Sequence, residues 1–433
     1  MVIITVKFVT LGCKTNFYES EALAELFRRA GHEVIKNGAA DAYVINTCTV
    51  TGTGAQKSRQ QIRRARKQNP NAVVAVTGCY AQTEAEKVQA MPEVDIVVGN
   101  ARRSRLVELT EQAAAGKKSS DVSDIMQERK FEELAVASHQ SRVRATVKIE
   151  DGCNNFCSYC IIPYARGPVR SRPIENVVRE VEELGRSGYA EVVLTGIHIG
   201  SYGLDGGEYS LIDVIEAVHK IDGIARIRLG SIEPVVITED FVRRAAKLNK
   251  LCRQFHLSLQ SGCDATLERM RRRYTTAEYR DAVMRLREHM TDVSITTDMM
   301  VGFAGETEED FQSSYTFAKE IEFLQMHVFP YSIREGTRAA EFPDQLPERV
   351  KEDRAHQMIA LSDEMKRNFC ERYLNRPIEV LLEQKKTDGR YQATSANYME
   401  FLVEGAEQEE SGALLTVQPY EYCEGILLAR PLR

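Results

Sequence analysis

The sequence lacks any apolar run near the ~20 residues that a membrane-spanning helix needs. Its start, MVIITVKFVTLGC, also lacks the basic region and small-residue cleavage site of a signal peptide, and instead predicts a first β-strand. We therefore expect a cytoplasmic protein with no membrane anchor.

An excess of positive charge is missing as well. The formal net charge is −6 and the isoelectric point is about 5.9. This balance excludes the uniformly basic surface of a non-specific nucleic-acid binder, so any RNA site must be local. The ten cysteines do not indicate a disulfide framework, because a reducing compartment favours metal ligands, catalytic groups or buried thiols.

The length of 433 residues predicts two or three domains. In the first, residues 1–115, strands are expected at 6–12, 42–47, 72–78 and 94–99, with helices at 18–29, 55–68 and 82–90. This alternation predicts a doubly wound parallel α/β sheet.

Three cysteines follow the first three of these strands. Cys13, Cys48 and Cys79 each come after a predicted carboxyl end, where ligands bind in open α/β sheets. Each could instead be a buried small residue, but three matched positions favour a shared ligand site.

Residues 116–141 are polar and unpatterned and predict a linker. Six βα units then follow within residues 142–372, and they favour a partial (β/α)6 barrel of TIM type. Among its helices we expect 276–289, 306–321 and 349–373. Residues 373–433 carry short strands that predict a small antiparallel OB-like β-barrel, with Asp388 and Gly389 in a type I′ turn.

Cys153, Cys157 and Cys160 form a C-x3-C-x2-C motif after the first barrel strand. A structural zinc site would need a fourth ligand, and no histidine follows at finger spacing. Three cysteines around a [4Fe–4S] cluster would leave one iron open for chemistry. Tyr159 is placed so that its ring could pack on the adenine of a nucleoside cofactor.

The segment CNNFCSYC carries the signature of the radical-SAM superfamily, and the whole chain resembles its methylthiotransferase family. LGCKTNFYESE, INTCTV, TGCYAQ, LTGIHIGSYG and HVFPYSIREGTRAA are similar to the branch that modifies N6-threonylcarbamoyladenosine in tRNA. Ala304 departs from the family, which commonly has proline there, and leaves one local turn in doubt.

The resemblance implies two [4Fe–4S] clusters and S-adenosylmethionine (SAM). Cys153, Cys157 and Cys160 would hold the radical-generating cluster, Cys13, Cys48 and Cys79 would hold a second one, and a C-terminal TRAM domain would bind substrate. An electron donor such as flavodoxin or ferredoxin is implied as partner. A radical is required because the hydrogen on carbon 2 of adenine is hardly acidic.

The resemblance also suggests SAM contacts at the barrel strand ends: Gly196, Glu233, Gln260 and Phe329. Each could instead serve packing or a turn. His198 is expected to make a structural hydrogen bond.

Basic residues suggest local tRNA contacts. One stripe at helical spacing comprises Arg59, Arg63, Arg66 and Lys67, and a second candidate is the run of Arg271, Arg272 and Arg273. Such stripes are usually solvated surface, and that alternative stays open.

Three other functions remain open. Two are methylthiolation of isopentenyladenosine in tRNA or of a ribosomal-protein aspartate. The third, from another class, is a non-catalytic iron–sulfur electron carrier or sensor, which would not need the barrel or its SAM-like motifs.

Overall fold

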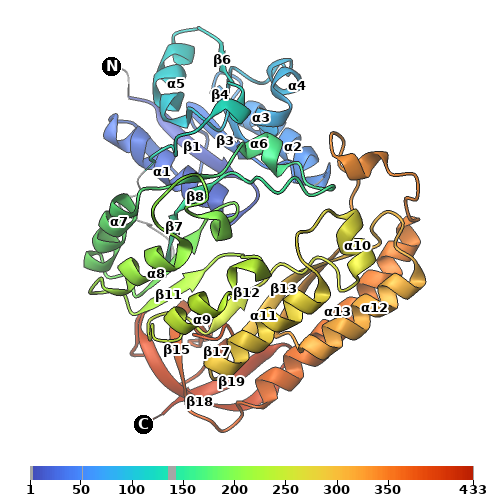
Figure 1. Ribbon diagram of the computed structural model, residues 1–433. Helices are drawn as coiled ribbons and strands as arrows, with labels where there is room; N and C mark the ends of the chain where they lie inside the picture. The colour runs from blue at the N-terminus through green and yellow to red at the C-terminus, as the bar shows by residue number, and fades with distance from the viewer. Residues whose placement is uncertain (1–2, 51, 135–142, 433) are drawn as a thin grey trace.

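A computed structural model describes residues 3–50, 52–134 and 143–432. The chain forms three parts that follow one another in space (Figure 1). An α/β sheet lies at one end, a partial barrel in the middle, and a small β-barrel at the other end. The α/β class and the three predicted architectures are confirmed, except that one strand pair of the C-terminal barrel is parallel and not antiparallel as predicted.

The N-terminal sheet has six parallel strands in the order β2-β1-β3-β4-β5-β6. Their bounds are Thr5–Thr10 (β1), Glu33–Ile35 (β2), Ala42–Thr47 (β3), Val73–Gly78 (β4), Ile96–Val98 (β5) and Ser119–Asp121 (β6). Helices α1 (Lys14–Arg29) and α5 (Leu106–Ala114) cover one face, and α2 (Gly52–Gln68), α3 (Cys79–Thr83) and α4 (Ala85–Gln89) cover the other. β3 and β4 are buried throughout, as strands covered on both faces must be.

Two strands of this sheet differ from the sequence prediction. β2 is only three residues long and was not expected. β6 falls inside the segment predicted as a linker and pairs with β5, so the N-terminal sheet extends to Asp121. The sequence of β6, Ser-Ser-Asp, has no apolar pattern. An edge strand of this kind contributes backbone hydrogen bonds and not core side chains. The helix predicted at 82–90 is broken into α3 and α4 at Glu84.

The central part has six parallel strands arranged as two three-stranded sheets, β11-β10-β7 and β12-β13-β14. Single bridges from Ile227 to Leu251 and from Ile232 to Leu257 join them. The strands are β7 (Arg144–Lys148), β10 (Glu191–Thr195), β11 (Arg226–Leu229), β12 (Gln254–His256), β13 (Ser294–Val301) and β14 (Gln325–Pro330). The short β8 (Glu150–Asp151) and β9 (Arg170–Ser171) pair with each other beside the barrel.

Helices surround the barrel on its outer side (Figure 1). They are α7 (Ile174–Arg186), α8 (Leu211–His219), α9 (Glu239–Ala245), α10 (Asp264–Arg269), α11 (Thr276–His289), α12 (Glu308–Ile321) and α13 (Glu348–Glu371), whereas α6 (Ile162–Arg166) lies against α3 at the boundary with the N-terminal sheet. α11 begins where predicted, because Thr275 caps it in a capping box with Glu278. α12 begins two residues later than predicted, because Thr307 is its cap. The turn containing Ala304 forms without the family's proline, and Ala304 is buried there.

The C-terminal part is a closed barrel in the order β15-β16-β17-β19-β18. Its strands are β15 (Ile378–Lys385), β16 (Tyr391–Ser395), β17 (Glu400–Val403), β18 (Leu414–Cys423) and β19 (Ile426–Pro431). The type I′ prediction at Asp388 and Gly389 is wrong, because only Gly389 has positive φ, at 88°. The amide of Gly389 instead donates to the carbonyl of Lys386, and the register shifts nearby.

In the part of the chain that the structure describes, no helix is long and apolar enough to cross a membrane.

Gly78 connects β4 to Cys79 and generates a stability prediction. Its φ is 94°, and a Cβ added there would lie 2.4 Å from Asn46 Oδ1 and 2.5 Å from the carbonyl of Thr47. Gly78→Ala should therefore lower the free energy of unfolding by at least about 3 kcal/mol, from backbone strain and the clash together.

Gly38→Ala is the matched control, because Gly38 has φ 89° and nothing within 4 Å of the added Cβ. It should cost about 1 kcal/mol, from strain alone. Denaturant unfolding of both variants measures the difference, and equal losses would refute the close approach at Gly78.

Candidate functional site

The N-terminal cysteines converge because their strands are neighbours. The sheet order reverses between β1 and β3, and ligands bind at such a switch point. Cys13 caps α1 after β1, Cys48 follows β3, and Cys79 begins α3 directly after β4. A Cβ added to Gly12 would lie 3.1 Å from Cys48 Sγ, so that sulfur packs on the turn before Cys13.

Burial, with smaller contributions from Cys13 and Cys48, raises the pKa of Cys79 to about 11, although Arg166 opposes the rise. Burial and Cys13 also raise the pKa of Cys48. The folded sheet thus gathers three cysteines that lie far apart in the sequence.

The other three cysteines lie in the loop between β8 and α6. Burial raises the pKa of Cys153 and of Cys160 to about 12, and Cys157 contributes to both shifts. Cys79 raises the pKa of Cys160 as well. Helix α3, which begins at Cys79, packs against α6, which begins two residues after Cys160, so the two sets of cysteines lie near each other across the boundary between sheet and barrel.

The described residues contain no group of three or more His, Cys, Asp or Glu side chains that could hold a single metal ion. A four-iron cluster makes a different demand, because each thiolate binds its own iron and the sulfurs need not converge on one point. The raised thiol pKa values mean that metal must displace protons on binding, as it does at cysteine sites in general.

Each cysteine set has a buried arginine that donates to one of its sulfurs. Arg166 Nε lies 3.2 Å from Cys79 Sγ, and Arg272 Nη1 lies 3.3 Å from Cys157 Sγ. Both donors fit a cluster with thiolate ligands, because hydrogen bonds and positive charge stabilise sulfur that carries negative charge. Neither role was predicted. Arg166 stands in the motif IIPYARG, but nothing local marks an arginine that reaches a cysteine 87 residues away.

The predicted tRNA contact at Arg272 conflicts with its environment. Its side chain is only 6% exposed, and Nη2 lies 2.7 Å from Glu233 Oε1. Although burial opposes ionisation, His198 and Arg272 hold the pKa of Glu233 down to about 2. The Arg272 guanidinium thus binds Glu233 and Cys157, because the middle arginine of an exposed-looking run can turn inward when the backbone bends at Arg271, whose φ is 57°.

A buried ion network joins the sheet to the barrel behind both cysteine sets. Lys148 Nζ lies 2.7 Å from Oε1 of Glu19 on α1, and Arg166 Nη2 lies 3.1 Å from Oε2. Arg103 forms a third ion pair with the same carboxylate. Asp151 lies 2.6 Å from Lys148. Isolated burial of such charges would be costly, and here each has partners of opposite sign.

The predicted SAM contacts lie around the carboxyl ends of the barrel strands. Tyr159 packs edge-on against Phe303. Gln260 has a φ of 69° and is bridged to β13. Glu233 is 8% exposed, and Phe329 on β14 is 36% exposed. These positions suit a ligand laid over the strand ends, and the structure leaves the contacts themselves as a prediction.

Gly196 has a local reason to be glycine. A Cβ there would lie 2.7 Å from Glu150 Oε2, and its carbonyl accepts a hydrogen bond from Thr15 of the N-terminal sheet at 3.2 Å. Glu150 also accepts the amide of His198 at 2.7 Å. Burial raises the pKa of Glu150 to about 8.

The predicted tRNA stripe on α2 divides into two kinds of residue. Arg66 donates to three backbone carbonyls and pairs with Asp95, so it ties α2 to the sheet. Arg59 donates to the Tyr80 hydroxyl at 3.2 Å. Arg63 is 65% exposed, and Lys67 is exposed too. Of these four residues only Arg63 and Lys67 are largely exposed, and Arg63 Nε also lies 3.9 Å from Glu93 Oε1.

Two family models match the chain. Residues 147–318 match the radical SAM superfamily, and residues 5–99 match uncharacterized protein family UPF0004. The radical SAM match covers the barrel with the second cysteine set, and the other covers the sheet with the first.

Curated relatives match nearly the whole chain. The threonylcarbamoyladenosine tRNA methylthiotransferase MtaB of Bacillus subtilis is 43% identical, over 97% of this chain and 96% of its own length. A tRNA-2-methylthio-N(6)-dimethylallyladenosine synthase of Clostridium novyi is 36% identical, over 86% and 84%.

Among solved structures, the radical S-adenosylmethionine methyltransferase TsrM from Kitasatospora setae matches with a TM-score of 0.57 and 15% identity. The match covers 76% of this chain and 72% of that one. At this identity the likeness concerns the fold alone.

Glu150 generates a prediction about pH. Its folded pKa of about 8 lies above the ordinary 4.5 of a glutamate. Between these values the unfolded chain loses a proton that the folded chain keeps, so wild-type stability falls as pH rises through this window. Glu150→Gln removes the titration, and the variant should gain on the order of 3 kcal/mol over wild type between pH 5 and pH 8.

Denaturant unfolding of both iron-free proteins at the two pH values measures this gain. A stability difference that stays constant with pH would contradict the raised pKa.

Proposed function

Because the chain belongs to the radical-SAM tRNA methylthiotransferase family, we propose that it adds a methylthio group to carbon 2 of N6-threonylcarbamoyladenosine next to the anticodon. The observation that carries the proposal is the 43% identity, over 97% of the chain, to a relative named for this nucleoside. The 36% identity to a synthase named for the dimethylallyl nucleoside keeps that base as a second candidate.

Cys153, Cys157 and Cys160 would hold the radical-generating cluster, and Cys13, Cys48 and Cys79 would hold the second one. Adjacency supports this assignment, since α3, which begins at Cys79, packs against α6, which follows Cys160 in the chain. A base bound between the sheet and the barrel could then meet both sets without moving.

When bound, the clusters and SAM supply the radical and sulfur chemistry that breaks an unactivated C–H bond. The residues of the chain hold and orient these groups. Arg166 and Arg272 donate N–H groups to Cys79 and Cys157 and offset negative charge on the sulfurs. Glu233 is kept ionised by His198 and Arg272, which suits it to accept hydrogen bonds from a cationic or hydroxyl-bearing cofactor.

The network around Glu19 fixes the distance between the two cysteine sets. Its members come from α1, from Arg103 after β5 and from the β7–α6 segment, and all are nearly inaccessible to water. A rigid, dry boundary suits radical chemistry, because it excludes side reactions with solvent.

Binding of tRNA requires local positive charge near its phosphates, and the exposed ends of Arg63 and Lys67 could supply that charge. The enzyme also needs a one-electron donor such as flavodoxin or ferredoxin. We place its action in the cytoplasm, where tRNA is modified and used.

Replacing Cys48 should separate the two cluster functions. Cys48→Ala should lower the iron content from about eight to about four per chain, because one of two four-iron clusters loses a ligand. Formation of 5′-deoxyadenosine from SAM should remain measurable, while the 2-methylthio product in tRNA disappears. Iron analysis and mass spectrometry of tRNA nucleosides measure both effects.

The matched variant carries Ala at Cys153, Cys157 and Cys160, and it should lose SAM cleavage while keeping about four irons. Near wild-type methylthiolation by a Cys48→Ala protein that lacks its second cluster would overturn the assignment. The same mass spectra identify the nucleoside, and a methylthio product only on the dimethylallyl base would favour the second candidate.

Charge reversal on α2 tests the tRNA face. Arg63→Glu with Lys67→Glu should weaken tRNA binding and reduce the salt slope by about two, because each lost phosphate contact releases fewer counterions. Arg186→Glu with Lys220→Glu makes the same charge change on the outer barrel helices and should leave the slope unchanged. tRNA binding measured across a range of salt concentrations gives both slopes. Identical slopes in the two variants would mean that α2 is solvated surface and makes no contact with tRNA phosphates.

A further inference from the structure

A cavity reaches the outer side of the second cysteine set. It has a volume of about 340 Å³ and is lined by Phe156, Cys157, Ser158, Cys160, Tyr164, Arg271, Thr337 and Arg338. Two of the three cysteines proposed to hold the radical-generating cluster thus lie in its wall. Cys13 and Phe329, which mark the side where sheet and strand ends face each other, do not line it.

The charges at this cavity have one sign. Arg271 and Arg338 are both exposed, and neither guanidinium pairs with a carboxylate of the described residues. No acidic residue is among those that line the cavity. In a chain with a net charge of −6, this is a local positive site on a protein that otherwise repels acidic partners.

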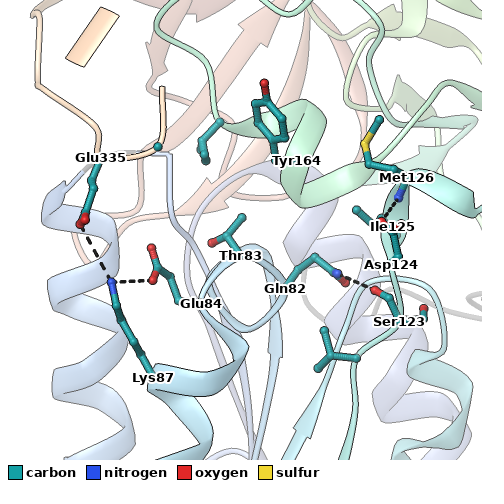
Figure 2. A pocket seen from close by; sticks show the side chains of 13 residues that line it. Gln82, Thr83, Glu84, Lys87, Ser123, Asp124, Ile125, Met126, Tyr164 and Glu335 are labelled. Atoms are coloured by element: carbon teal, nitrogen blue, oxygen red, sulfur yellow. Dashed lines mark hydrogen bonds and ion pairs between the residues drawn. The ribbon is translucent and has the colours of Figure 1, made fainter. Parts of the chain in front are cut away.

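Two aromatic rings form the apolar part of the wall. Phe156 and Tyr164 are in edge-to-face contact with centroids 5.7 Å apart. Tyr164 is 47% exposed, so much of its ring is accessible at the surface. It lies at the rim of this cavity and of a neighbouring one of about 600 Å³ (Figure 2).

The neighbouring cavity has a different character. Its one lining cation, Lys87, lies 2.8 Å from Glu84 and 4.0 Å from Glu335, and Asp124 adds a third carboxylate to the lining (Figure 2). Of these two cavities, the one at Cys157 and Cys160 is lined by cations without a carboxylate, whereas the neighbouring one has more carboxylates than cations.

We propose that this cavity is the docking site of the electron donor, a small acidic flavoprotein of the flavodoxin type. The inference rests on the proposed function, which requires a cluster at Cys153, Cys157 and Cys160. Arg271 and Arg338 attract the acidic surface of the donor, and Phe156 and Tyr164 pack against the exposed edge of its flavin. The reduced flavin loses one electron and the cluster gains it; no bond is formed or broken.

This position leaves the strand-end side free for the tRNA. Donor and substrate would approach from different sides, so reduction need not wait until the tRNA has left. The path from the flavin edge to the cluster would run through only the wall formed by Cys157 and Cys160.

The test compares a protein donor with a small one. In Arg271→Glu with Arg338→Glu, the rate of cluster reduction by reduced flavodoxin at low salt should fall by about tenfold or more, since electrostatic steering of this kind contributes factors of about 10 to 10³. Reduction by photoreduced deazaflavin, which needs no docking, should be unchanged. Bleaching of the cluster absorbance gives both rates, and binding of flavodoxin to the iron-free protein gives an independent readout.

Arg349→Glu with Lys220→Glu is the control of equal charge change, at exposed sites on α13 and directly after α8, and its cluster should be reduced at the wild-type rate. Arg271→Gln with Arg338→Gln should show an intermediate loss of the reduction rate, and it replaces the first variant if that one fails to fold.

Unchanged rates of cluster reduction by flavodoxin would overturn the proposal. So would a loss confined to tRNA binding, or a loss seen with a ferredoxin and not with flavodoxin. If photoreduced deazaflavin reduces no cluster even in the wild-type protein, the proposed function is wrong, because that function requires the cluster.

Discussion

The structure depends on one buried carboxylate. Glu19 on α1 is inaccessible to water and is surrounded by Arg103, Arg166 and Lys148. These cations hold the pKa of Glu19 well below its usual value, although burial alone would raise it. Removing one partner of such a pair leaves an uncompensated charge and typically costs about 3–5 kcal/mol. The same Arg166 reaches Cys79, so the interaction that joins sheet to barrel also sets the position of a proposed cluster ligand.

Much of the fold follows from local sequence patterns. The strands around VINT and VVAVTG are continuous apolar runs, and the capping box of α11 marks its start to the residue. The cysteine sets were also predictable, since C-x3-C-x2-C is specific and Cys48 and Cys79 directly follow strand ends. Their roles as cluster ligands remain predictions. β6 and the turn at Asp388 were missed, because an edge strand has no apolar pattern and one dipeptide suits several turn types.

The rest of the site depends on contacts distant in sequence. Arg166 and Glu19 are 147 residues apart, and Arg272 and Cys157 are 115 apart. In the sequence both arginines resemble surface charges, and the run RRR favours RNA binding. The backbone at Arg271 decides otherwise, because its left-handed conformation turns Arg272 inward while Arg271 and Arg273 stay exposed. No local pattern encodes that difference.

The boundary between sheet and barrel limits how these parts can be exchanged. Arg334, which follows β14, donates to the carbonyl and hydroxyl of Thr49, the residue after Cys48. Arg166 of the barrel donates to Cys79 of the sheet. The barrel half thus completes the surroundings of two of the cysteines in the sheet half. A chimera that takes residues 5–99 from a relative would inherit its cysteines without their donors unless the recipient barrel has arginines at both positions. Recombination between such enzymes should therefore succeed as matched pairs of domains, not as free modules.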